Sequence, residues 1–115
     1  MARNRETIIT SSTHNILASG TQMKGNISAE EDFRIDGILE GNINCKGKII
    51  IGTNGEINGE IECINVDLLG KVKGNILCHE TVILRSSCTM TGEVKTQTIE
   101  IEPGATFTGS CSMKE

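Results

Sequence analysis

The sequence predicts an all-β fold, a single-stranded parallel β-helix of about six rungs. Three observations lead to this prediction. A seven-residue pattern centred on a glycine recurs six times, an alternating apolar strip precedes most of its copies, and turn-forming residues lie between the two. Self-similarity at a short fixed period is typical of solenoids, in which stacked repeats bury a core that no single repeat can form alone.

The repeated pattern reads apolar, any, glycine, any, apolar, any, small. Its six copies are centred on Gly25, Gly41, Gly59, Gly74, Gly92 and Gly109, and the interval between neighbouring glycines varies only slightly. A period near 17 is too short for most helical repeats and fits one turn of a β-solenoid. Rungs stacked about 4.8 Å apart would pair their backbones into parallel sheets and align equivalent residues in columns.

Apolar strips with period-two alternation precede five of the patterns: Phe33–Ile35, Ile49–Ile51, Val66–Leu68, Val82–Leu84 and Ile99–Ile101. Alternating β-branched residues favour strands over helices. Turn signals such as Asp36-Gly37 and Pro103-Gly104 follow the strips, and the second pair suits the centre of a type II turn. The spacing from strip to glycine switches between a shorter and a longer value, which indicates that one corner of the rung is a variable loop.

The alignment also predicts two outward columns that are polar in every rung. One column holds Asn26, Asn42, Glu60, Asn75, Glu93 and Ser110, and its neighbour holds Lys24, Glu40, Asn58, Lys73, Thr91 and Thr108. Residues 1–16 lack the repeat. We therefore expect a short disordered N-terminal tail, followed by a β-helix domain over residues 17–113.

The composition limits which side chains can fill the core and which kinds of partner the chain can bind. In 115 residues there are 13 Gly and two Phe but no Trp or Tyr, which suits a narrow aliphatic core in one small domain. The net charge of −4 comes from interspersed charges, so neither a basic patch nor aromatic stacking platforms suggest a nucleic-acid partner. The longest apolar run is too short to span a membrane and no signal-peptide core is present, so we expect a cytoplasmic protein.

The five cysteines have no metal-like spacing. Cys45, Cys63 and Cys78 share one position of the rung, Cys111 replaces an apolar residue of the pattern, and Cys88 stands where other rungs carry glycine. All five have the parity of core-facing residues, and free cysteine behaves as a small buried hydrophobe. We therefore expect packing, and slow reaction with thiol reagents, rather than metal or redox chemistry.

Catalytic residues, metal ligands and cofactor-binding residues are not expected. His14 lies in the tail, and His79 has no partner in its own column, so no Ser/His/Asp set is suggested. Neither a phosphate-binding glycine loop nor a calcium-binding nonapeptide repeat occurs. The main enzymatic alternative is a hexapeptide-repeat acyltransferase, and the switch between two strip-to-glycine spacings breaks the sixfold period that it requires.

The chain resembles the bactofilins, small polymer-forming bacterial proteins. The resemblance rests on the recurrent motif in Lys24-Gly25-Asn26-Ile27 and its copies, on Phe33-Arg34-Ile35-Asp36-Gly37 and on Ile101-Glu102-Pro103-Gly104-Ala105, and it covers residues 17–113. It implies a right-handed β-helix that assembles into nucleotide-independent cytoplasmic filaments, with roles in cell shape or in placing cell-wall enzymes. Many bactofilins carry a membrane-binding N-terminal segment; here only Ile8 and Ile9 offer an apolar contact.

We therefore expect a structural protein whose partner is itself, with cell-wall or cell-shape proteins as further partners and the inner face of the cytoplasmic membrane as an open location. The alternative is a monomeric β-helix that displays one face to a partner. A monomer must cap its open rungs, yet the repeat runs to Met113. The expected polymer interface comprises Phe107, Cys111 and Met113 at one end, and Leu17 and Met23 at the other.

Overall fold

The computed structural model describes residues 15–113, and within that range every regular element is a strand. The first strand already contains Asn15 and Ile16, which the sequence pattern assigned to the tail; residues 1–14 lie outside the described range. The strands are β1 (Asn15–Leu17), β2 (Gln22–Lys24), β3 (Ile27–Ala29), β4 (Phe33–Ile35), β5 (Ile38–Glu40), β6 (Ile43–Cys45), β7 (Lys48–Ile51), β8 (Glu56–Leu68), β9 (Lys71–Leu84), β10 (Thr89–Thr96), β11 (Thr98–Ile101) and β12 (Thr106–Met113).

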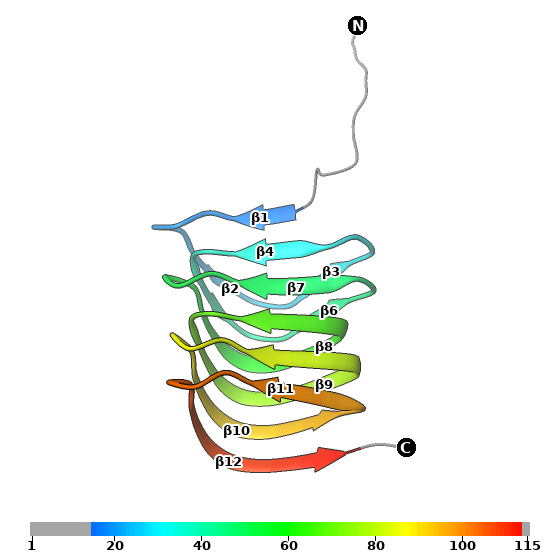
Figure 1. Ribbon diagram of the computed structural model, residues 1–115. Helices are drawn as coiled ribbons and strands as arrows, with labels where there is room; N and C mark the ends of the chain where they lie inside the picture. Colours follow the sequence, from blue (N-terminus) through cyan, green and yellow to red (C-terminus); the bar gives the residue numbers. More distant parts are fainter. Residues whose placement is uncertain (1–14, 114–115) are drawn as a thin grey trace, which may run out of the picture.

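The strands stack as a parallel solenoid of six rungs, which confirms the predicted fold class (Figure 1). Each rung has a short arm, formed by an apolar strip, and a long arm, formed by a glycine pattern. The short arms pair in the order β1, β4, β7, end of β8, end of β9 and β11. The long arms pair in the same order, from β2 and β3 down to β12. The first and last rungs consequently form opposite ends of the stack.

The core is a set of aliphatic columns, as the parity of the strips predicts. Buried residues alternate with outward ones in both arms: Ile35, Leu39, Ile43, Cys45, Ile49, Ile51, Ile57, Ile61, Cys63, Val66, Leu68, Val72, Ile76, Cys78, Val82, Leu84, Cys88, Met90 and Val94. The two predicted polar columns point outward in the predicted register. Burying one aliphatic side chain is worth about 1.5–3 kcal/mol, so this repeated layering is the main stabilising contribution.

The glycine of each pattern bends the long arm. At Gly92, φ is +133°, a region that favours glycine, and a Cβ atom there would overlap the carbonyl oxygen of Gly74 in the preceding rung. The same close approach recurs from Gly41 to Gly109. A column of glycines is therefore a steric requirement of stacking bent rungs in register.

The length of the corners that join the arms explains why the interval between the pattern glycines varies. The corner after the short arm contains a hydrogen-bonded turn in the third rung, where Gly55 N donates to Gly52 O over 2.8 Å, and in the fifth, where Cys88 N donates to Arg85 O over 3.0 Å. The second and fourth rungs cross the same corner with two residues fewer. The corner after the long arm also varies, with a register irregularity between Cys63 and Asn65, so both corners are variable, not one as expected.

Candidate polymerisation surfaces

Both ends of the solenoid present strands that pair on one side only. At the N-terminal end, β1, β2 and β3 pair only with the second rung. At the C-terminal end, β11 pairs only with β9, and β12 pairs only with β10. Among residues 15–113 no element covers either end. Such rows of unpaired N–H and C=O groups are templates for pairing with another chain.

The C-terminal end is apolar. Phe107 is half-buried against the core, and Cys111 and Met113 are exposed. Cys111 keeps the inward parity of Val94, its neighbour in β10, but no further rung covers it among residues 15–113. The expectation that all five cysteines are buried is therefore wrong for Cys111.

Three apolar residues of this end were not included in the interface expected from the sequence, namely Ile99, Ile101 and Ala105. Ile101, the last residue of β11, has inward parity and is 52% exposed because the rung that would cover it is absent. Its place in the last apolar strip was the available signal. These three residues form the apolar surface of the C-terminal end together with Phe107, Cys111 and Met113.

The N-terminal end carries the complementary set of core positions. Leu17 and Met23 are half-buried, as are Ile27 and Ala29, which the sequence reasoning did not include. Gly25 begins the glycine column, and a Cβ atom placed on it would meet nothing within 4 Å. This end therefore has the space to receive a further rung.

Three of the four buried thiols have raised pKa values, whereas the hydrogen bond with Cys63 lowers the pKa of the fourth, Cys78, to about 6. Burial raises the pKa of Cys45 and of Cys88, and a hydrogen bond with Cys78 together with burial raises the pKa of Cys63. The thiolate is the reactive species of cysteine. The raised pKa gives the expected slow reaction with thiol reagents a physical basis at Cys45, Cys63 and Cys88, whereas at Cys78 that expectation rests on burial alone and Cys111 is accessible.

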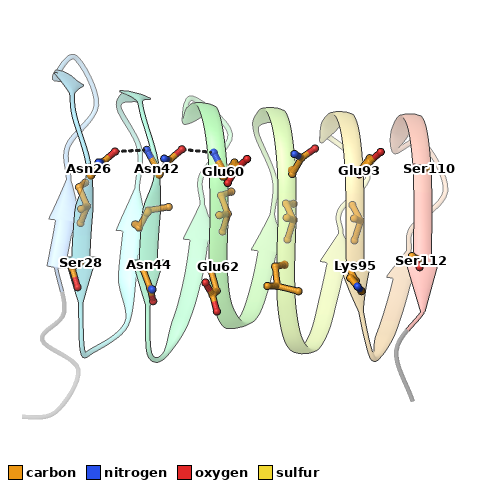
Figure 2. Close-up of a pocket in the computed structure, with 17 residues that line it drawn as sticks. Asn26, Ser28, Asn42, Asn44, Glu60, Glu62, Glu93, Lys95, Ser110 and Ser112 are labelled. Atoms are coloured by element: carbon orange, nitrogen blue, oxygen red, sulfur yellow. Dashed lines mark hydrogen bonds between the residues drawn. The ribbon is translucent and has the colours of Figure 1, made fainter.

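A groove of about 740 Å³, lined by both polar and aliphatic side chains, runs along the bend of the long arms across all six rungs (Figure 2). Its rim contains a ladder in which Asn26 Oδ1 accepts from Asn42 N over 3.2 Å, and Asn42 Oδ1 accepts from Glu60 N over 3.0 Å. The bend turns these backbone N–H groups outward, and the asparagine side chains satisfy them. The ladder therefore has a structural role, which is to stabilise the bend of the long arm.

The chemistry available on this surface is limited. His79 is exposed and its Nε2 lies 3.3 Å from Glu62 Oε2 of the preceding rung, a residue that belongs to the column of Leu77 and not to the column of His79. In the described part of the chain no group of three or more His, Cys, Asp or Glu side chains could hold a metal ion. Over the same residues, no helix is long and apolar enough to cross a membrane. Ile8, Ile9 and His14 lie outside the described residues.

The geometry defines a class of protein: a parallel β-solenoid with open, apolar ends over its described residues. A family model described as "Bactofilin: Polymer-forming cytoskeletal" matches residues 15–112. Bactofilin BacO of Myxococcus xanthus (strain DK1622) is 33% identical over 98 residues, which span 85% of this chain and 78% of that protein.

A solved structure agrees. The cryo-EM reconstruction of Thermus thermophilus bactofilin double helical filaments superposes with a TM-score of 0.83 at 30% identity, and the match covers 88% of this chain and 100% of that one. The chain belongs to the bactofilin family of polymer-forming cytoskeletal proteins, which confirms the resemblance found in the sequence.

Proposed function

We propose that this bactofilin assembles end to end into nucleotide-independent filaments through the two open rungs. The observation that supports this most directly is the half-buried Phe107 beside the exposed Ile101, Cys111 and Met113, on a rung whose strands are paired on one side only. Completing the burial of a Phe side chain contributes up to about 1.5–3 kcal/mol. A further copy would also satisfy the unpaired backbone groups of β11 and β12.

The filament would serve as a cytoplasmic scaffold for cell shape or for the placing of cell-wall enzymes. Support for this part comes from the family, whose members are polymer-forming cytoskeletal proteins, and from the filamentous assembly of the Thermus thermophilus relative. The alternative, a monomeric module that displays one face to a partner, would leave the apolar end uncovered.

Negative-stain electron microscopy of the purified full chain without nucleotide tests the proposal, with long filaments as the expected result. Phe107→Arg places a charge in the end contact and should give short assemblies or monomers while the β-rich circular dichroism spectrum persists. Thr108→Arg is the matched control, since Thr108 is the outward neighbour in the same strand and should leave filaments intact. A folded Phe107→Arg protein that still forms long filaments would contradict the proposal.

A further inference from the structure

The groove of the long arms carries negative charge along one edge (Figure 2). Its lining includes three acidic residues, Glu60, Glu62 and Glu93, and one basic residue, Lys95. Glu60 and Glu93 stand two rungs apart in the outward column that begins at Asn26, and that column contains no basic residue. Lys95 belongs to the other edge, together with Glu62. We call the edge that carries Glu60 and Glu93 the acidic edge.

The two carboxylates of the acidic edge are available to a partner. Glu60 and Glu93 are exposed, and within residues 15–113 neither of them takes part in an ion pair. Glu62, by contrast, lies 3.3 Å from His79 Nε2. The spacing of neighbouring strands sets Glu60 and Glu93 about 9.6 Å apart along the stack. The acidic edge therefore presents two negative charges at a fixed separation.

The chain itself contains a segment of opposite charge. Residues 1–14 lie outside the described range, and they contain Arg3 and Arg5 against one acidic residue, Glu6. In an extended segment, residues two apart project to the same side and are separated by about 7 Å. Two long arginine side chains can cover the difference between this separation and the one between Glu60 and Glu93. The segment therefore matches the acidic edge in both charge and spacing.

The described chain begins beside the groove. Asn15 N donates to Asp32 O over 3.1 Å, and Asp32 belongs to the corner that follows β3, the groove strand of the first rung. Ten peptide units join Arg5 to Asn15, and they can span up to about 33 Å. Glu60 lies two rungs further along the stack, a distance of about 9.6 Å. The segment is therefore long enough to reach the acidic edge within the same copy.

Tethering compensates for the weakness of exposed ion pairs, each of which contributes little alone. A segment joined to its site by a short stretch of chain has an effective concentration of about the millimolar range, so a weak contact can still be occupied. The column across the bend, from Lys24 to Thr108, contains two lysines and one glutamate, so the segment has no comparable site there. These observations favour the chain's own segment as the occupant of the groove.

We propose that the segment containing Arg3 and Arg5 docks along the groove of its own copy, with Arg5 at Glu60 and Arg3 at Glu93. The groove lies on the side of the stack. Docking therefore leaves both open rungs accessible and is separate from the end contact of the proposed function.

Docking would also decide what Ile8 and Ile9 can contact. These two residues are the apolar contact considered for a membrane, and they follow Arg5 so closely that a docked Arg5 keeps them beside the solenoid. The groove and a membrane would compete for one segment. The groove would thus act as an internal regulator of membrane contact.

Cross-linking within one chain tests the docked position. In a Cys111→Ser background, which removes the accessible thiol found within residues 15–113, Thr7→Cys is combined with Asn44→Cys in the second rung of the groove and treated with a short bismaleimide. The matched control combines Thr7→Cys with Arg34→Cys, an exposed position of the same rung whose register partner is Ile16, next to the start of the described chain. An undocked segment would react at least as readily at the control position. Mass spectrometry should therefore find several-fold more intramolecular product with Asn44→Cys.

Charge reversal tests the ion pairs. Arg5→Glu should lower the yield at Asn44→Cys several-fold, and Glu60→Arg in the same protein should restore it, whereas Glu100→Arg on the short arm should not. Salt at about 1 M, where the Debye length is about 3 Å, should lower the parent yield in the same way. Equal yields for the two cross-linking pairs, or no rescue by Glu60→Arg, would overturn the proposal. A product that joins two copies would assign the groove to the segment of a neighbouring copy and would overturn it as well.

Discussion

Cys78 and Thr96 occupy the same position of successive rungs and perform the same task at the same corner. Cys78 Sγ donates to Ile64 O over 3.0 Å and to Thr81 O over 3.3 Å. Thr96 Oγ1 donates to Glu80 O over 3.0 Å and to Thr98 O over 3.1 Å. Each side chain has one donor hydrogen, which it shares between one carbonyl of its own corner and one of the preceding rung. The cysteine column is therefore also a column of donors for buried turns, which packing alone did not predict.

The first prediction is that Cys78→Ala is more destabilising than Cys78→Ser. Alanine leaves two corner carbonyls without this donor, and an unsatisfied buried polar group costs about 1–3 kcal/mol, whereas serine retains a hydroxyl. The free energy of unfolding from urea titration, compared at equal slope, measures the difference. Equal losses for the two variants would show that the corner does not need the donor.

The stability lost on replacing a glycine of the repeated pattern is expected to depend on the position of that glycine in the stack. Gly92→Ala adds overpacking of about 1–3 kcal/mol to a backbone strain of about 1–3 kcal/mol, because its Cβ atom meets the Gly74 carbonyl oxygen. Gly25→Ala has the same strained φ, +130°, without the overlap, and should retain most of the stability. Thermal unfolding followed by circular dichroism checks both, and a Gly25→Ala protein as unstable as Gly92→Ala would contradict this explanation.

Stability should fall as the solution becomes alkaline. Burial raises the pKa of Cys88 above its ordinary value of 9.0, so the unfolded chain loses this proton first as pH rises. The contribution is complete below about pH 9 and decreases above it, with a limiting slope of about 1.4 kcal/mol per pH unit for each such thiol.

Cys88→Ala is the matched control for this slope, since alanine occupies the equivalent position, Ala105, in the next rung. The variant should lose less stability than the parent chain between about pH 8 and pH 10, which urea titrations at several pH values would measure. Parallel pH profiles for the two proteins would count against a raised pKa of Cys88.

Two N-terminal deletions should show that residues 1–14 and the first rung contribute differently to folding and assembly. Removing residues 1–14 keeps the strand that begins at Asn15, whose N–H donates to Asp32 O over 3.1 Å, and should preserve folding and assembly. Removing residues 1–17 deletes β1 and uncovers Phe33 and Ile35 of β4, so it should lower the unfolding midpoint. Loss of assembly in the shorter deletion would show that residues 1–14 take part in it.

Much of the fold was predictable because one period controls several properties at once. The glycine spacing, the parity of the strips and the outward polar columns all specify the same register, and the structure has that register. The turn at Pro103-Gly104 was also identifiable, and Gly104 has the positive φ, +99°, that its second central position requires.

The candidate site was harder to predict because the alternation of residues in a strand shows which way a side chain points, but not whether another rung covers it. Cys111 and Ile101 point inward like their neighbours and are exposed only because the stack ends there. The Glu62 partner of His79 comes from the preceding rung, one full turn earlier in the chain.

The outward residues of the short arms alternate between isoleucine and a charged residue from rung to rung, in the order Ile16, Arg34, Ile50, Asp67, Ile83 and Glu100. This alternation gives the solenoid a natural unit of growth of two rungs rather than one. Long and short corners alternate through the first four rungs, as isoleucine and charge do, and one such pair of rungs separates Gly25 from Gly59. Duplicating such a pair would lengthen the rod by about 9.6 Å and keep the alternation in phase. A single inserted rung would put two charges or two isoleucines side by side, so evolution or design can vary the length of this protein most easily in steps of two.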